Sequence, residues 1–343
     1  MKILFCTVPF RPSTGGIETV SALLAERFQA LGHEVVLATQ SKSSLIDTDA
    51  FRVVRQPTAR QLVELVRRAD VVFHNNISLR LAWPLLFVRR PWVIAHHTWL
   101  PQFGLAALVK RSVLRVARHI AVSRAVAASL PVPSTVVPNP YADDVFVSRP
   151  DVARRCDLLF VGRLVSDKGV SLLLEALGLL RQRGRMVGLT VIGDGPEAPA
   201  LRRQATVLGI DEQVTFTGRR AGSELAASLN AHRVLVVPSV WEEPFGVVAL
   251  EAMACGCVPL VARSGGLPDA VGGCGVVVTR GNVAALADGI ELLMSDDGLR
   301  ERLRDGMALH LARHTRDQVA RDYLGVIDDA CRSHATQSTA RAV

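Results

Sequence analysis

Short apolar runs alternate with longer amphipathic segments along most of the chain, which predicts a succession of buried strands and helices. The runs expected to form strands lie at 2–7, 34–39, 70–74, 92–96, 118–122 and 134–138, and then at 157–161, 188–193, 213–216, 233–237, 257–261 and 275–278. Apolar strands separated by helices are typical of parallel sheets that are covered on both faces. The pattern therefore predicts an α/β protein with two doubly wound sheets in succession.

A stretch with turn chemistry separates the two series of strands. It runs from Pro138 to Asp144 and continues with Ser148-Arg149-Pro150. We therefore predict an N-terminal Rossmann-like domain over 1–150 and a C-terminal one over 151–314, in agreement with a length of 343 residues. A helix over 315–331 is expected to pack back on the N-terminal domain, and a polar tail is expected over 332–343.

Composition narrows the class of protein. Apolar residues make up 49% of the chain, yet there is no uncharged apolar stretch of about 18 residues that could span a bilayer. The opening apolar run is broken by Pro9 and Arg11, which argues against a signal peptide and for a cytoplasmic protein. The net charge of +8 predicts an anionic partner, such as a phosphorylated substrate, nucleic acid or anionic lipid.

The densest chemical signal runs from Pro238 to Gly256. An expected strand ends just before it, Pro244 suits the first turn of a helix, and Gly256 suits the end of that helix. The free amides at the start of this helix, which are those of Phe245, Gly246 and Val247, form a ready site for a phosphate group.

Two carboxylates in this segment, Glu243 and Glu251, have seven residues between them. On a helix they lie about 10–12 Å apart along the axis, which is too far for the paired carboxylates of a glycosidase at about 5–9.5 Å. The span suits two carboxylates that each hold a hydroxylated ring on either side of a diphosphate. Because the helix around Glu251 is apolar nearly all round, its carboxylate needs such a partner.

The segment resembles the glutamate-x7-glutamate motif of retaining glycosyltransferases of family 4, which have the GT-B fold, with two Rossmann-like domains facing each other across a cleft. Further matches to this family are Leu158 to Gly169, Val191 to Glu197, Phe216 to Arg219 and Gly265 to Val271. The resemblance implies that Arg163 and Lys168 hold the donor diphosphate, that Glu243 holds the sugar and that Glu251 binds the ribose. It also implies that Gly193, Gly218 and Arg219 line the nucleotide side of the cleft.

The N-terminal half carries two further matches. Gly15 and Gly16 follow the first strand and open a helix, and adjacent glycines let a ligand approach the backbone closely. They resemble the glycine loop of the family, which closes over the donor phosphate. Two histidines end the strand that follows Pro91. The family has a histidine here that contacts the transferred sugar, and the register from Pro91 selects His97 rather than His96.

The resemblance implies a retaining transferase that moves a sugar from a nucleotide-sugar donor (UDP or GDP) to an acceptor hydroxyl, with the leaving diphosphate helping to take the acceptor proton. Its acceptor would be a glycan, a lipid-linked glycan or a small molecule, in bacterial polysaccharide, lipopolysaccharide or glycolipid synthesis. No cofactor and no metal are expected. Asp47-Thr48-Asp49 has metal-binding spacing but follows no apolar strand, and Cys255-Gly-Cys257 lacks a second ligand pair.

Two other enzymes share this fold, a nucleotide-sugar epimerase and a glycan phosphorylase. The phosphorylase needs a late lysine for pyridoxal phosphate, and the last lysine of the chain is Lys168. A third hypothesis is a non-catalytic nucleotide-sugar-binding subunit. Nucleic-acid binding is not expected, since the basic clusters lack interleaved aromatic residues.

Much of the basic excess falls on an expected helix over 103–118. Its basic side carries Lys110, Arg111, Arg115 and Arg118, and the opposite side carries Leu105, Val109, Val113 and Val116. Such a helix suits peripheral contact with an anionic membrane on the cytoplasmic side. The alternative is an ordinary amphipathic helix that docks on the first sheet with its basic face in solvent.

Overall fold

The computed structural model describes residues 1–12, 15–43, 50–101 and 103–342, without the side chains of 105–107 and 337–342. The chain forms two compact units, one of Met1–Pro140 with Arg316–Val343 and one of Tyr141–Thr315. The division therefore falls at 140/141, ahead of the predicted 150/151. It follows directly on Pro140, at the start of the turn-rich stretch, whose remaining residues belong to the second unit.

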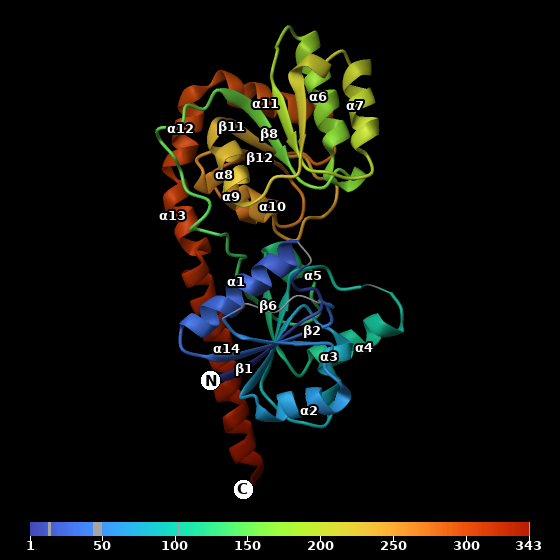
Figure 1. The fold of residues 1–343 in the computed structure, drawn as a ribbon, viewed down its shortest axis with the longest axis vertical. Coiled ribbons are helices and arrows are strands. Elements are labelled where there is room, and N and C mark those ends of the chain that lie inside the picture. The colour runs from blue at the N-terminus through green and yellow to red at the C-terminus, as the bar shows by residue number, and fades with distance from the viewer. Residues whose placement is uncertain (13–14, 44–49, 102, 343) are drawn as a thin grey trace. The chain divides into compact units, whose positions relative to one another are not determined.

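The first unit contains a parallel sheet of seven strands in the order β3-β2-β1-β4-β5-β6-β7 (Figure 1). The strands are β1 Lys2–Thr7, β2 Glu34–Thr39, β3 Arg52–Arg55, β4 Val71–Asn75, β5 Trp92–His96, β6 Arg118–Ala121 and β7 Thr135–Val136. Its helices are α1 Gly16–Ala30, α2 Ala59–Arg68, α3 Leu79–Ala82, α4 Leu105–Leu114, α5 Arg124–Ser129 and α14 Arg316–Ala342, with a short helical turn at Trp83–Leu86.

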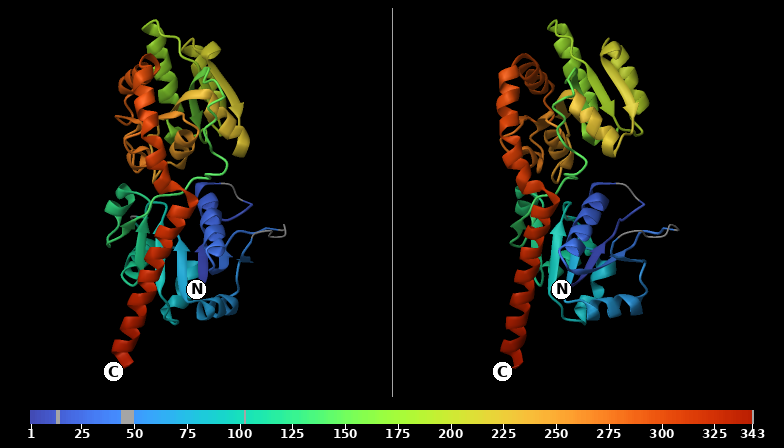
Figure 2. Two further views of the ribbon diagram at one scale, coloured as in Figure 1. Left: turned by 90° about the vertical axis from the view of Figure 1, so that its left-hand side faces the viewer. Right: turned by 60° about the vertical axis from the view of Figure 1, so that its left-hand side comes forward.

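The two faces of this sheet have separate cores. One is covered by α1 and α14 and contains the aromatic residues Phe5, Phe28, Phe73 and Tyr323, whose rings meet edge-on or tilted at 4.8–6.3 Å between centroids. The other face is covered by α2 and α3, with Leu114 from the end of α4. The last helix of the chain thus completes the core of the first unit. Figures 1 and 2 show this helix running along the first unit.

The second unit contains a parallel sheet of six strands in the order β10-β9-β8-β11-β12-β13. The strands are β8 Cys156–Val161, β9 Leu189–Ile192, β10 Val214–Gly218, β11 His232–Val237, β12 Val258–Ala262 and β13 Val276–Val278. The helices are α6 Val170–Gln182, α7 Ala198–Val207, α8 Gly222–Ala231, α9 Val247–Ala254, α10 Leu267–Val271, α11 Val283–Ser295, α12 Asp297–Asp305 and α13 Met307–Leu311, with helical turns at Ser166–Lys168, Asp211–Gln213 and Ala312–His314. This strand order is that of dinucleotide-binding doubly wound sheets.

Arg154 ties the ends of two helices of the second unit together. Its guanidinium donates to the carbonyls of Leu229, Asn230 and His232 at the end of α8, and to the carbonyl of Cys255 at the end of α9. A cation at a helix C-terminus is stabilising because it satisfies orphan carbonyls and faces the negative end of the helix dipole. Arg154 therefore holds α9, which carries Glu251, in place.

Three segments differ from their sequence-based predictions. Strand β3 was not predicted, because Arg52-Val53-Val54-Arg55 offers only two apolar residues at the edge of the sheet. The helix expected over 103–118 is confined to 105–114, and Arg118 instead begins β6. The polar tail expected over 332–343 was also wrong, since α14 continues to Ala342.

No helix in the described ranges is both long enough and apolar enough to cross a membrane.

Candidate functional site

In each sheet the winding direction reverses between two neighbouring strands, β1 and β4 in the first unit and β8 and β11 in the second. Open α/β sheets bind ligands at this point, outside the carboxyl ends of the strands. The structure places predicted site residues there in both units: Gly15 and Gly16 follow β1, Arg163 and Lys168 follow β8, and Glu243 to Val247 follow β11.

The loops that follow β8 and β11 pack directly on each other. The backbone amides of Val240 and Trp241 donate to the carbonyl of Asp167, at 3.0 and 3.1 Å. Gly169 has a φ of 71°, and a Cβ on it would lie 2.2 Å from the carbonyl oxygen of Pro238. Only glycine fits this position, so the close contact of the two loops depends on Gly169.

The side chains of Lys168 and Glu243 form an ion pair where these loops meet. The Lys168 ammonium lies 2.5 Å from Oε1 of Glu243, and the Ser239 hydroxyl donates to the same oxygen at 2.8 Å. The side chains are only 21% and 15% exposed. Arg163, five residues before Lys168, is exposed. The lysine expected at the diphosphate and the glutamate expected at the sugar are therefore direct neighbours.

The backbone of Glu243 is held by the loop that follows β12. Its carbonyl accepts from the amide of Gly266 at 2.7 Å, and a Cβ on Gly265 would lie 2.0 Å from that oxygen. The preceding carboxylate, Glu242, accepts from the amide of Gly265 at 2.9 Å and pairs with Arg280. Glu242 was not among the predicted site residues, although its position beside Glu243 was a signal. Its contacts identify it as an anchor of this loop.

Helix α9 begins later than predicted. It starts at Val247, so Pro244 is not in its first turn. Gly246 adopts a φ of 116° and separates Pro244 from the helix, and a Cβ on it would lie 2.5 Å from Leu267. The ring of Phe245 is buried against His314. The three residues from Pro244 to Gly246 therefore separate Glu243 from the start of α9.

Glu251 lies on α9 among buried neighbours, which are Ala249, Leu250, Ala252 and Met253. Burial raises the pKa of its carboxyl group from 4.5 to about 7. A carboxylate that is costly to ionise in the free protein gains most from a ligand that donates hydrogen bonds to it. This environment agrees with the expectation that Glu251 needs a partner.

Replacing Glu251 with glutamine is expected to stabilise the second unit at alkaline pH. The native carboxyl has a pKa of about 7 against 4.5 unfolded, so the native state binds the proton more tightly and stability falls as pH rises between these values. Above pH 7, glutamine is expected to raise the free energy of unfolding by on the order of 2–3 kcal/mol.

Urea unfolding at about pH 5 and about pH 8 measures this difference in the free energy of unfolding. Glu301→Gln, at an exposed carboxylate of α12, is the control. An equal effect of Glu251→Gln at both pH values would contradict the assignment.

The predicted nucleotide-side residues lie at the ends of β9 and β10. The amide of Gly193 donates to the carbonyl of Gly218 at 2.9 Å, which joins the two strand ends. A Cβ on Gly193 would lie 1.8 Å from the carbonyl oxygen of Gly162, so this loop also packs on the backbone that precedes Arg163. Arg219 follows with an exposed side chain.

His97 directly follows β5 of the first unit and is 5% exposed. Its amide donates to Oδ1 of Asn76, a residue in the left-handed region with a φ of 64°. Neither ring nitrogen makes a well-formed hydrogen bond within the described structure. Burial lowers the pKa of the ring to about 4, although the side chain of Asn139 favours a higher pKa. His97 is therefore a neutral imidazole at neutral pH, with donor and acceptor capacity for a ligand.

His96 has a different environment. Its Nε2 lies 3.1 Å from Nδ1 of His119, and Nε2 of His119 lies 2.7 Å from the carbonyl oxygen of Leu114. Burial lowers the pKa of His96 to about 3. These contacts engage His96 within the protein, whereas the ring of His97 is not engaged in this way. Asn76 was not among the predicted site residues, and its only signal was its place just after β4.

Gly15 caps the start of α1 in an extended conformation, with a φ of −169°. A Cβ on Gly15 would meet only the flexible side chain of Glu18, and one on Gly16 would meet nothing within 4 Å. Among the described residues, no backbone contact therefore demands glycine at these two positions. Ser13 and Thr14 of the same loop lie outside the described residues, as does Asp47-Thr48-Asp49.

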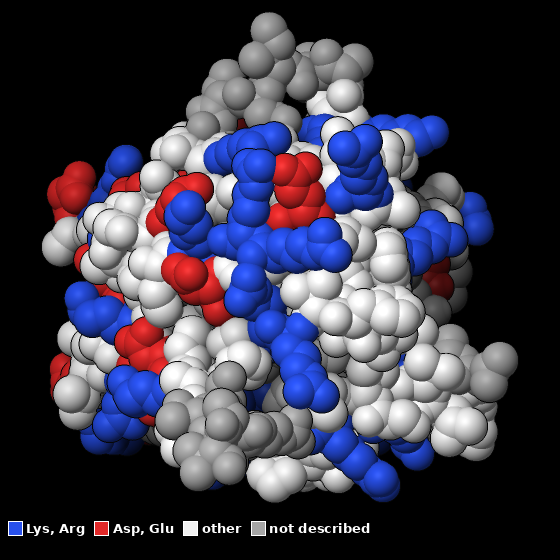
Figure 3. All heavy atoms as spheres, turned by 90° about the horizontal axis from the view of Figure 1, so that it is seen from below, with Lys and Arg blue, Asp and Glu red and all other residues white. Residues whose placement is uncertain are grey.

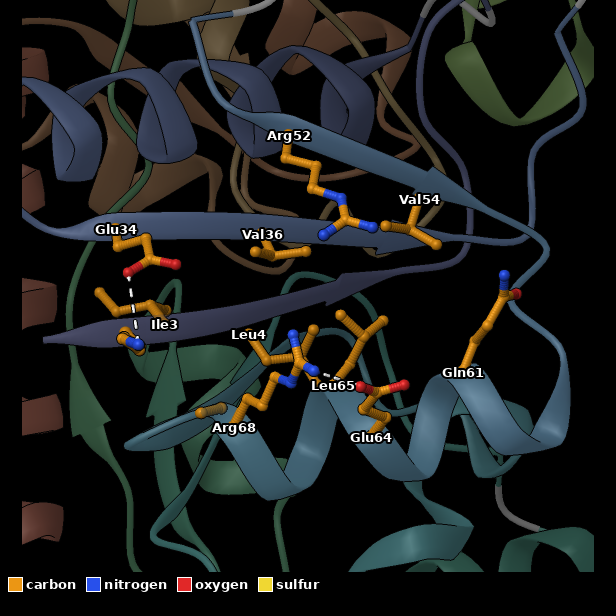
Figure 4. A pocket seen from close by; sticks show the side chains of 12 residues that line it. Ile3, Leu4, Glu34, Val36, Arg52, Val54, Gln61, Glu64, Leu65 and Arg68 are labelled. Carbon is orange, nitrogen blue, oxygen red and sulfur yellow. Dashed lines mark hydrogen bonds and ion pairs between the residues drawn. The ribbon is translucent and has the colours of Figure 1, made fainter.

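A hollow of about 330 Å³ lies elsewhere in the first unit, between α2 and strands β1, β2 and β3 (Figure 4). Its floor is apolar, formed by Leu4, Val36 and Val54, and Glu64 and Arg68 pair at its rim. It contains none of the predicted site residues. Within the described ranges, no group of three or more His, Cys, Asp and Glu residues is arranged to hold a metal ion.

The chain has two α/β domains, each with a parallel doubly wound sheet and with its site loops at the carboxyl ends of the strands. This architecture is that of the GT-B class of glycosyltransferase folds. Residues 14–141 match the family described as Glycosyltransferase Family 4, and residues 151–307 match the one described as Glycosyl transferases group 1. The chain belongs to glycosyltransferase family 4, group 1. The resemblance and the expected fold class of two parallel-sheet α/β domains of GT-B type are thereby confirmed.

Relatives of known name match over about half of the chain. A D-inositol 3-phosphate glycosyltransferase of Stackebrandtia nassauensis is 37% identical over 187 residues, which cover 51% of this chain and 42% of that protein. An alpha-D-kanosaminyltransferase of Streptomyces kanamyceticus is 33% identical over 182 residues, which cover 49% of this chain and 47% of that protein. The chain thus spans less than half the length of these relatives.

A solved structure matches nearly the whole chain. HepE of Anabaena, in complex with UDP, has a TM-score of 0.83 and 23% identity, covering 96% of this chain and 100% of that one. This likeness shows the fold.

Proposed function

We propose that this protein is a retaining glycosyltransferase that transfers a sugar from a nucleoside diphosphate donor to an acceptor hydroxyl. The observation that carries the proposal is the shielded Lys168–Glu243 pair, placed between the end of β8 and the start of α9 in a family 4 chain. This place is where a doubly wound sheet binds phosphate-bearing ligands.

Within this proposal, Lys168 and Arg163 stabilise the departing diphosphate, together with the amides of Phe245, Gly246 and Val247. Preorganised donors that face developing charge are the largest single contribution in many enzymes. When the diphosphate takes Lys168 as its partner, the Glu243 carboxylate is released toward the hydroxyl groups of the sugar. The chain then needs no side chain as general base, because the leaving diphosphate takes the acceptor proton.

The remaining predicted residues orient the donor. Glu251 accepts hydrogen bonds from the ribose hydroxyls, and Gly193, Gly218 and Arg219 lie on the nucleotide side. In the first unit, His97 as a neutral imidazole contacts the transferred sugar, and the small Gly15 and Gly16 admit the donor phosphate. The ring nitrogens of His97, which make no well-formed hydrogen bond within the described residues, support this role.

The names of similar proteins support a nucleotide-sugar donor. HepE of Anabaena is described in complex with UDP and with UDP-glucose. We therefore place UDP first among the donors and GDP second. The acceptor would be a glycan, a lipid-linked glycan or a small molecule such as the inositol phosphate named for the relative of S. nassauensis, in polysaccharide, lipopolysaccharide or glycolipid synthesis.

Calorimetric titration with UDP-, GDP- and ADP-sugars, followed by product analysis with and without an acceptor, tests the proposal. We expect one nucleotide class to bind, and transfer with retention at the anomeric carbon. Turnover of the donor to its epimer without an acceptor would indicate the epimerase instead. Binding without any turnover would indicate a non-catalytic subunit, and no binding at all would remove the transferase from consideration.

Removing divalent cations is expected to change the rate of transfer by less than about twofold. The cations of Arg163 and Lys168 and the start of α9 supply positive charge where a metal ion otherwise would. The measurement compares initial rates in EDTA and in added Mg²⁺ or Mn²⁺. A loss of activity in EDTA that Mg²⁺ restores would contradict metal independence.

We also propose peripheral contact with an anionic membrane on its cytoplasmic face. Around α4, Phe103, Leu108 and Val109 are 89%, 64% and 42% exposed beside the cations Lys110 and Arg111. Exposed apolar side chains next to basic ones suit a bilayer surface. Sedimentation with vesicles, with Leu108→Ser as the variant, tests this contact, and unchanged sedimentation would contradict it.

A further inference from the structure

Two neighbouring hollows lie at the amino end of strands β5 and β6, at the edge of the sheet opposite to the one that carries Gly15 and His97. One has a volume of about 410 Å³ and the other about 590 Å³. They share Arg115, Ala117, Arg118 and Ser333. Figure 3 shows Lys and Arg side chains gathered on a face of the molecule seen from this direction.

The ionisable residues that line these hollows are mostly basic. Arg90, Arg115 and Arg118 line the smaller hollow, together with Ser333 and His334, and none of its lining residues is acidic. The larger hollow adds Arg332 and one carboxylate, Asp329, and these two pair with each other. Guanidinium groups gathered in this way repel one another, and an anion between them would lower the electrostatic energy.

Two of the guanidinium groups are held in place by the fold. Arg90 donates to the carbonyls of Val66 and Arg67 in the last turn of α2. Arg118 donates to the hydroxyl of Ser333 on α14 at 3.1 Å. Each of these groups keeps further N–H donors, because a guanidinium has five. Arg115, at the end of α4, is exposed and adds a third cation to the rim.

We propose that Arg90, Arg115 and Arg118, with Ser333 and His334, form a binding site for a phosphate group. Arginine presents planar forked donors that match the oxygens of phosphate, and a charge-assisted hydrogen bond is stronger than a neutral one. Trp92 and Ala117 are apolar members of the lining and do not compete for the anion. The phosphate belongs either to a free anion or to a lipid headgroup. This site stands apart from the donor site of the second unit and does not depend on the proposed transferase activity.

The experiment uses the full chain with Lys168→Ala as a common background, which removes one of the cations expected to hold phosphate at the proposed donor site. Inorganic phosphate is titrated by calorimetry at low ionic strength. We expect Arg115→Gln combined with Arg118→Gln to weaken phosphate binding at least about tenfold. Arg60→Gln, an exposed arginine on α2 that lines neither hollow, is the matched control and is expected to change it less than about twofold.

A second arm distinguishes the source of the phosphate. The same proteins are sedimented with vesicles of phosphatidylcholine, with and without phosphatidic acid. Binding of free phosphate indicates a free anion, and binding confined to phosphatidic acid vesicles indicates a headgroup. Either result supports the site when the double variant loses binding of the probe and Arg60→Gln keeps it.

Because Arg118 also contacts α14, the single variant Arg115→Gln is measured as well, and it must also weaken binding of the probe. Binding of neither probe, or equal weakening by Arg60→Gln, would overturn the proposal.

Discussion

Exchange of Lys168 for methionine is expected to lower the turnover of sugar transfer by about 10²- to 10³-fold, the usual effect of removing one preorganised donor from a developing anion. The side chain is shielded and lies 2.5 Å from Glu243, in the helical turn that follows β8. Methionine keeps most of the length of the lysine but carries no charge. Because the charge on the diphosphate grows as the bond to the sugar breaks, the loss is expected in kcat as well as in donor affinity.

Lys2→Met is the control for this exchange. Lys2 also pairs with a glutamate, Glu34 at 3.8 Å, but both side chains are more than half exposed and lie in the first unit. Its replacement is expected to leave turnover unchanged. Steady-state rates and calorimetric donor affinity are measured for both variants, with thermal unfolding as a check of folding. Unaltered turnover in Lys168→Met would remove this lysine from the mechanism.

The contact between Lys168 and Glu243 also predicts that their effects are not independent. Among the described residues, removing the cation leaves the Glu243 carboxylate with its hydrogen bond from Ser239, so Glu243→Gln is expected to cost less in the Lys168→Met background than in the native protein. A coupling energy above about 1 kcal/mol in the double-mutant cycle is expected for residues in direct contact. Additive effects would show that the two side chains act at separate points of the reaction.

Continuous apolar runs made the buried strands easy to predict. Strands β1 and β8 are such runs, and their ends located the loops that carry Gly15 and Arg163. Strand β3 was missed because an edge strand with arginine at both ends carries little of this signal. The polar sequence after residue 331 has no apolar period, so the continuation of α14 to Ala342 was missed as well.

Positions of site residues were predictable from strand ends, but their contacts were not. The pair of Lys168 with Glu243 joins residues 75 positions apart, and the contact of His97 with Asn76 depends on how two strand ends meet. The start of α9 was misplaced because proline commonly opens a helix, whereas here the positive φ of Gly246 keeps Pro244 outside it. Such backbone geometry is decided by tertiary packing and not by local preference.

Ending the chain after Thr315 is expected to leave the first unit unable to fold, while the second unit keeps its cooperative unfolding transition. Helix α14 contributes six buried apolar side chains to one core of the first unit: Val319, Ala320, Tyr323, Leu324, Ile327 and Ala330. Truncating a single large core side chain costs about 2–5 kcal/mol, and a domain has only about 5–15 kcal/mol of stability. Circular dichroism and limited proteolysis measure the outcome. A shortened chain with a protease-resistant first unit would contradict it.

Single substitutions on α14 give a graded form of this prediction. Ile327→Ala is expected to lower the free energy of unfolding of the first unit by about 3 kcal/mol, since Ile327 is fully buried. Tyr323→Phe is expected to be neutral or stabilising, because the Tyr323 hydroxyl is buried without a hydrogen-bond partner in the described structure. Arg321→Ala, at an exposed position of the same helix, is the control. Urea unfolding measures all three variants, and a loss in Tyr323→Phe as large as that in Ile327→Ala would mean that the hydroxyl, and not the ring, holds α14 on the sheet.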